Sequence, residues 1–79
     1  MTKYLTYVSQ TGVGFVAWVG EASHAEMSVA VKAQKVRSAG FMQLMPTGEL
    51  HCDGESVSLD VKARPEDSQL ANNLFRMEG

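Results

Sequence analysis

A chain of 79 residues has room for one hydrophobic core, and its single cysteine leaves that core without a disulfide. In chains shorter than roughly 80 residues, the gain from burying apolar surface and the entropic cost of ordering the chain nearly cancel. Such domains are commonly stabilised by disulfides, a metal or self-association. We therefore predict one compact domain over residues 1–79 that forms a homo-oligomer, with a dimer favoured.

The charge balance narrows the range of partners. Seven Lys and Arg residues against nine Asp and Glu residues give a net charge of −2, which disfavours nucleic acid as a partner. No stretch approaches roughly 18 consecutive apolar residues, so we expect no membrane partner. Residues 1–7 lack the apolar segment of a signal peptide, and the free Cys52 suits a reducing compartment, so we expect a cytoplasmic protein.

The first 19 residues predict a β-hairpin. Residues 3–9 are rich in Tyr, Thr and Val, a turn signal follows at residues 10–12, and residues 13–19 form a second apolar run. Residues 15–19 are apolar at every position. Such a strand is either covered on both faces or has one face against another chain.

Residues 24–38 allow two interpretations. Ser23 and Glu26 have the spacing of a capping box, and Gly40 suits the position after a helix C-terminus. A helical stripe supports this interpretation and consists of Ala25, Val29, Ala33 and Val36. The competing pattern is an alternation typical of a strand, formed by Met27, Val29, Val31 and Ala33. The helix is the favoured prediction because its cap, stripe and stop signal agree.

The second half predicts three more strands and a helix. The strands are residues 41–45, residues 50–52 and residues 57–62, with turns at residues 46–49 and at Asp53-Gly54. In the last strand, alternation directs Val57, Leu59 and Val61 to the core. Pro65 begins a helix whose apolar stripe is Leu70, Leu74 and Met77. The chain is thus α+β, in the order β-β-α-β-β-β-α, with an antiparallel sheet of about five strands and two helices on one face.

This arrangement predicts an interface. If both helices cover one face of the sheet, the apolar residues on the other face need a second subunit. The expected interface residues are Phe15, Val16, Trp18, Met42 and Leu44. The leading hypothesis is therefore a homo-oligomeric binding or interaction protein.

Chemistry-bearing residues are few. His51, Cys52 and Asp53 are consecutive, but neighbouring strand residues point to opposite faces, so a strand over residues 50–52 disfavours His51 as the base for Cys52. We expect Leu50 and Cys52 to face the core and His51 and Asp53 to face water. No metal-ligand spacing, phosphate loop or nucleophile elbow is present, so the sequence assigns no catalytic residue, metal or cofactor and does not favour an enzyme.

Two other hypotheses stay open. One is a small-molecule-binding or catalytic pocket at a subunit junction, lined by His51, Asp53, Glu55 and Arg64. The other is an inhibitor or adaptor that binds a larger protein.

Overall fold

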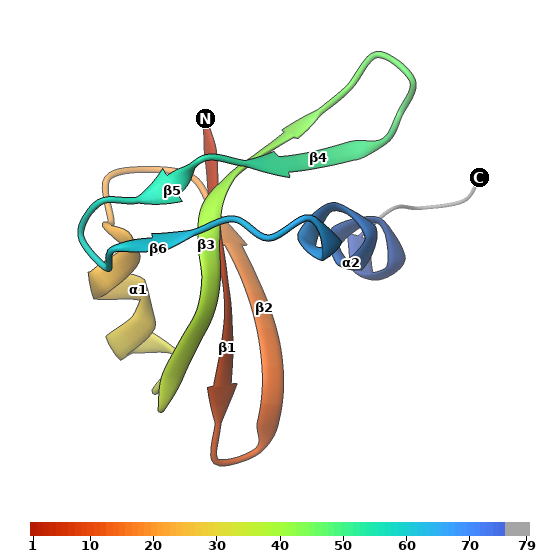
Figure 1. The fold of residues 1–79 in the computed structure, drawn as a ribbon. Coiled ribbons are helices and arrows are strands. Elements are labelled where there is room, and N and C mark those ends of the chain that lie inside the picture. Colours follow the sequence, from red (N-terminus) through yellow and green to blue (C-terminus); the bar gives the residue numbers. More distant parts are fainter. Residues whose placement is uncertain (76–79) are drawn as a thin grey trace.

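The computed structural model describes residues 1–75, which form a four-stranded sheet, a two-stranded sheet and two helices (Figure 1). The elements are β1 (Thr2–Ser9), β2 (Gly12–Trp18), α1 (His24–Ala30), β3 (Lys35–Leu44), β4 (Leu50–Asp53), β5 (Glu55–Ser56), β6 (Val61–Lys62) and α2 (Glu66–Phe75). All strand pairs are antiparallel. The predicted α+β class is confirmed, and the element order follows the prediction except for an additional short strand.

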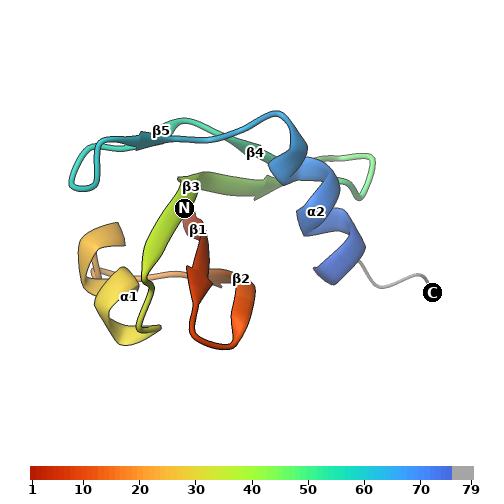
Figure 2. The same ribbon diagram turned by 60° about the horizontal axis from the view of Figure 1, so that its bottom comes forward.

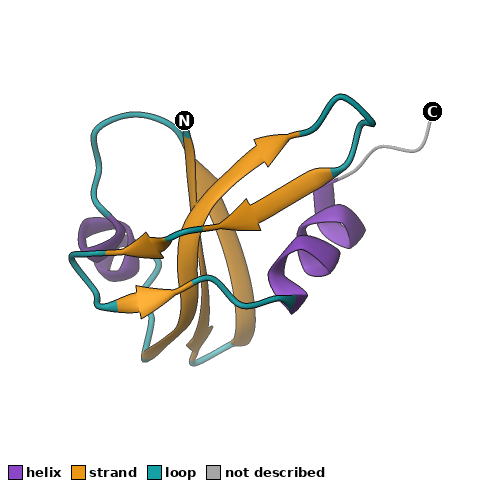
Figure 3. Ribbon diagram, turned by 45° about the horizontal axis from the view of Figure 1, so that its top comes forward, coloured by secondary structure: helices purple, strands orange, loops and turns teal. Residues whose placement is uncertain are grey.

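The larger sheet has the order β2-β1-β3-β4, so β2 and β4 are its edge strands. The β1–β2 hairpin turns at Gln10 and Thr11, and Ser9 pairs with Gly12, whose φ of 121° few other residues adopt. The β5–β6 pair crosses over β3 and leads into α2 (Figure 3). This crossing places the start of α2 against the sheet.

The face of the larger sheet that carries the Tyr4 side chain packs against α2, and we call it the α2 face. Tyr4 is fully buried and stacks on Phe15, with ring centroids 5.2 Å apart. The core on this face combines buried and partly buried residues, namely Tyr4, Cys52 and Ala71 with Phe15, Ala17, Met42, Leu50 and Ala63. The α2 face therefore holds the main hydrophobic core.

The opposite face of the sheet packs against α1, and we call it the α1 face. His24 is buried there with its ring between those of Trp18 and Phe41, at centroid distances of 5.4 and 5.6 Å. Its Nε2 lies 2.9 Å from the carbonyl oxygen of Gly40. Trp18 Nε1 and Lys3 Nζ both donate to the carbonyl of Ala22, at the start of α1.

The prediction that both helices cover one face is therefore wrong. Tyr4 points to α2, whereas its neighbours along the chain point to the other face, because strand residues alternate. Figure 2 shows α1 and α2 on opposite sides of the sheet. Each face of the sheet thus has a helix of its own.

The predicted helix over residues 24–38 is about half as long in the structure. Its capping box is confirmed, since Ser23 Oγ accepts from the N–H of Glu26 and Glu26 Oε1 accepts from the N–H of Ser23. The helix ends at Ala30, and Lys32 has a φ of 56°. The chain then pairs with β1, where residues 35–42 supply the second neighbour that this central strand needs.

Gly40 lies inside β3 and does not end a helix, so that prediction was also wrong. A Cβ at Gly40 would overlap the carbonyl oxygen of Asp53 and lie 3.3 Å from the Cβ of Ala63. Glycine at this position lets the segment that carries β5 and β6 cross close above β3. The competing interpretation, a strand over residues 27–33, does not apply either, because most of these residues form α1 and the turn after it.

The continuous strand predicted over residues 57–62 is replaced by a turn between two short strands. Val57 is 89% exposed, so the expectation that it faces the core is wrong. Ser56 Oγ accepts from the N–H of Leu59 and stabilises the turn. Gly54, with a φ of 84°, connects β4 to β5 in the second sheet and is not a hairpin turn. Met77, the last residue of the predicted stripe, lies outside the described residues.

Candidate functional site

The two edges of the larger sheet differ in how their backbone groups are satisfied. At the β4 edge, Asn72 Oδ1 accepts from the N–H of Leu50 at 2.8 Å, and Asn72 Nδ2 donates to the carbonyl of Leu50 at 2.9 Å. One turn earlier on α2, Ser68 Oγ accepts from the N–H of Cys52 at 2.9 Å. Side chains of α2 thus occupy the position where a fifth strand would pair.

At the opposite edge, β2 pairs with β1 alone, and no other strand within residues 1–75 pairs with its outer side (Figure 1). We call this outer side of β2 the open edge. Its seven residues, Gly12–Trp18, include no charged side chain and no proline. Val13 is 62% exposed, and Leu74 and Phe75 at the end of α2 are also exposed. Phe75 packs edge-on against Phe15, which brings the end of α2 close to β2.

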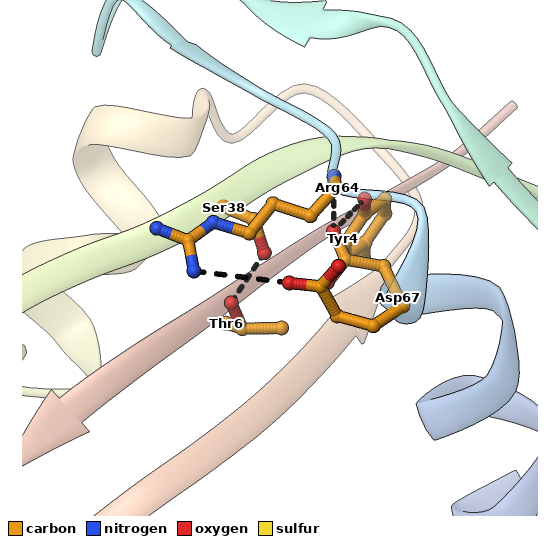
Figure 4. Close-up of polar contacts among 6 residues, drawn as sticks. Tyr4, Thr6, Ser38, Arg64 and Asp67 are labelled. Atoms are coloured by element: carbon orange, nitrogen blue, oxygen red, sulfur yellow. Dashed lines mark hydrogen bonds and ion pairs between the residues drawn. The ribbon is translucent and has the colours of Figure 1, made fainter.

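A polar cluster joins the start of α2 to the sheet (Figure 4). The hydroxyl of Tyr4 donates to Asp67 Oδ2 at 2.6 Å, and the backbone N–H of Arg64 donates to the same oxygen at 2.8 Å. Burial, and then the contact with Asp67, raises the pKa of Tyr4 above its ordinary value. Beside this pair, the hydroxyls of Thr6 and Ser38 hydrogen-bond to each other.

The cavity next to this cluster is small, with a volume of about 40 Å³. Its lining residues are Thr6, Arg37, Ser38, Arg64, Glu66, Asp67 and Leu70. This volume is far below the roughly 300–1,000 Å³ of sites that bind small molecules. Every buried side-chain nitrogen and oxygen within residues 1–75 has a hydrogen-bond partner. The cluster therefore anchors α2 and is not a binding pocket.

A larger groove of about 670 Å³ separates the β3–β4 turn from α2. Polar side chains predominate among its lining residues, which are Met45, Pro46, Thr47, Glu49, Leu50, His51, Ser68, Gln69, Asn72 and Asn73. Gln69 Nε2 donates to Asn73 Oδ1 within the groove wall. The groove offers amide and hydroxyl groups to a polar molecule.

The four residues predicted to bind a ligand do not converge. His51 Nε2 lies 3.4 Å from Asp53 Oδ2, and both side chains are exposed, as expected from their alternation with Cys52. Glu55 lies in β5, where it pairs with Lys62. The Arg64 guanidinium instead lies 3.8 Å from Glu66. The structure thus forms a His51–Asp53 pair and places the other two residues elsewhere.

Cys52 is buried, as expected, and burial is the main cause that raises the pKa of its thiol to about 11. A thiol with such a pKa is mostly protonated near neutral pH and reacts slowly as a nucleophile. In residues 1–75, no three His, Cys, Asp or Glu side chains are placed to hold a metal ion.

The five predicted interface residues are divided between the two faces. Phe15 and Met42 pack against the core of the α2 face. Val16 pairs with Leu5, and Trp18 packs against His24 on the α1 face. Leu44, at the end of β3, is 70% exposed. One flat interface cannot contain all five residues.

Sequence reasoning missed Asn72, Ser68 and the burial of Asp67. Ser68 and Asn72 are four residues apart and therefore share one face of α2. The sequence shows this spacing, but it does not show that the edge of β4 lies opposite these two side chains. An acidic residue in the first turn of a helix is common at the surface, so the sequence gives no sign that Asp67 is buried.

Neither the family models nor the curated proteins nor the solved structures include a significant match to this chain. None of the helices in the described part of the chain is long and apolar enough to cross a membrane.

Proposed function

We propose that this protein is a small binding protein that forms a homodimer through the open edge of β2. The observation that carries the proposal is the contrast between the two sheet edges. The edge at β4 is satisfied by α2, while the edge at β2 has no partner strand in the described chain.

Edge strands of monomeric proteins are commonly protected by lysines, prolines, bulges or a covering element. Gly12–Trp18 includes neither lysine nor proline, and its register with β1 is regular throughout. An unprotected edge of this length is suited to pairing with another strand.

A second copy of the chain fits this edge without charge repulsion. Two β2 strands can pair antiparallel about a twofold axis, so that the same surface is used on both copies and assembly closes at a dimer. The exposed Val13 belongs to β2 and Phe75 packs against Phe15 of β2, so both side chains would add apolar contact. A cytoplasmic location remains part of this proposal, since Cys52 needs no oxidising compartment.

The substitution Val13→Lys tests the interface. A lysine on an edge strand places a solvated charge where the second β2 would pair, whereas the chain itself leaves Val13 largely exposed. We expect the dimer dissociation constant to rise by about tenfold or more, which corresponds to about 1.4 kcal/mol. Sedimentation velocity over a concentration series measures it.

Val57→Lys is the matched control, because Val57 is more exposed than Val13 and lies in the β5–β6 turn. It makes the same charge change and should leave the dimer intact. A wild-type protein that stays monomeric at high concentration would contradict the dimer. The open edge would then be left for a strand of a larger protein, which is the inhibitor or adaptor hypothesis.

The groove between the β3–β4 turn and α2 favours a second candidate function, the binding of a small polar molecule. Its volume of about 670 Å³ falls within the usual range of ligand sites. Native mass spectrometry of freshly purified protein would detect a retained ligand. Backbone amide shifts at Thr47, Gln69 and Asn73 would then locate the ligand in the groove.

A further inference from the structure

We infer that Asn72 and Ser68 mask the β4 edge, so that another copy of the chain cannot pair with it. The inference rests on the proposed function in one respect, because the number of open edges decides whether assembly stops at a dimer. Its physical basis is independent of that function and lies in three hydrogen bonds between α2 and β4.

The Asn72 side chain imitates the backbone of a neighbouring strand. A primary amide has a carbonyl acceptor and an N–H donor, as a peptide group does. Asn72 uses both on a single residue, accepting from the N–H of Leu50 and donating to its carbonyl. Its second N–H donates to the carbonyl of Ser68, which fixes the side chain against its own helix.

The mask covers the outward backbone donors of β4. In an antiparallel strand, alternate residues direct their N–H and C=O groups to the same side. Leu50 and Cys52 are two residues apart and both bond to α2. β4 spans only Leu50–Asp53, so these two residues provide most of its outer edge.

The mask is held in place by contacts at both ends of α2. Near its start, Asp67 accepts from the Tyr4 hydroxyl on β1. At its end, Phe75 packs against Phe15 on β2. The helix therefore cannot leave β4 without breaking contacts with two other strands.

The consequence concerns the geometry of assembly. With both edges open, β2 of one copy could pair with β4 of the next, and such head-to-tail contacts continue without closing. With β4 masked, β2 is the edge strand of the larger sheet that is left to pair, and β2–β2 pairing closes at two copies. We therefore assign to Asn72 and Ser68 the role of limiting assembly.

The substitution Asn72→Leu in the full chain tests the inference. It keeps a side chain of similar size on the helix and removes all the hydrogen bonds to Leu50. We expect the Leu50 amide to exchange with solvent roughly tenfold faster or more. We also expect light scattering to show assemblies that exceed the wild-type mass and grow with concentration.

Asn73→Leu is the control. It adds the same apolar group to the same helix, at an exposed position whose amide is bonded only to Gln69. It should leave both the Leu50 exchange and the assembly mass unchanged. Equal growth in the two variants would mean that surface hydrophobicity drives association, which would overturn the inference.

Other outcomes separate this inference from the dimer proposal. If the wild type is monomeric but Asn72→Leu still associates, the result supports the masking of β4 by α2 and contradicts the β2 dimer. Another outcome is that Asn72→Leu folds, exchanges rapidly at Leu50 and forms a dimer of the wild-type mass. That result would contradict the role of Asn72 in limiting assembly and would support the dimer. Should Asn72→Leu not fold, Ser68→Ala exposes the Cys52 amide alone. That amide must then exchange faster, and unchanged exchange would contradict the inference.

Discussion

Asp67 is a charged residue that is only 2% exposed, and two donors make this burial possible. The Tyr4 hydroxyl and the Arg64 N–H converge on its Oδ2, so the carboxylate is hydrogen-bonded where water is excluded. The Tyr4 hydroxyl comes from a residue that is 63 positions away in the sequence. No local pattern could predict this pair, because a buried Tyr and an acidic residue at a helix start are each ordinary in isolation.

Tyr4 and Cys52 should make stability depend on alkaline pH. Burial raises the pKa of both groups, that of Cys52 to about 11, so the folded state keeps protons that the unfolded state releases earlier. Stability is therefore fully present below about pH 9 and falls above it, by up to about 1.4 kcal/mol per pH unit for each proton. Urea unfolding at a series of pH values measures the slope.

Two variants separate the contributions of the groups. Tyr4→Phe should remove the part of the slope that belongs to the phenol, and Cys52→Ala the part that belongs to the thiol. Tyr4→Phe should also lower the stability at pH 7 by about 1–3 kcal/mol, because Asp67 loses a buried donor. If the stability of the variant with both substitutions still falls at alkaline pH, other groups cause the dependence.

At the level of elements, the sequence correctly predicts where each helix begins. The capping box at Ser23 and the helix start after Pro65 depend on neighbouring residues, and both are confirmed. The length of α1 and the strand predicted over residues 57–62 were wrong, since long-range pairing decides them. Val36 belongs to the predicted helical stripe, yet it lies in β3 and pairs with Tyr7 of β1.

Gly40 marks the position where β3 meets the segment that carries β5 and β6. In Gly40→Ala, the new methyl group would overlap the carbonyl oxygen of Asp53, and backbone cannot move aside as a flexible side chain can. We expect a loss of about 1–3 kcal/mol or more in the free energy of unfolding. Thermal and urea unfolding measure the change.

Gly48→Ala provides the comparison, because a Cβ there meets no atom within 4 Å and the only cost is its φ of 87°. It should lower stability by no more than about 1–2 kcal/mol. A Gly40→Ala variant that is as stable as Gly48→Ala would show that the two layers separate easily.

For the whole molecule, the sequence predicted the α+β class but not the placement of the helices. Apolar residues on both faces of the strand at residues 15–19 were correctly recognised, and they suggested a second subunit. In the structure, α1 covers one face and α2 the other. Within residues 1–75, the outer side of β2 has no partner strand. Which strand lies at an edge depends on the strand order, and strand order leaves no hydrophobic pattern in the sequence.

The position of Cys52 beneath α2 gives the protein an internal reporter of its own opening. Cys52 is 7% exposed and packs in the cluster with Ala71 of α2. With a pKa of about 11 it also forms about a hundredfold less thiolate than an ordinary cysteine with a pKa of about 9. An aromatic disulfide reagent should therefore modify Cys52 only when α2 separates from β4. The rate of labelling then reports how often this separation occurs. We expect Asn72→Leu to label faster than Asn73→Leu, so that one cysteine and a mass spectrometer can follow how often the helix leaves the sheet.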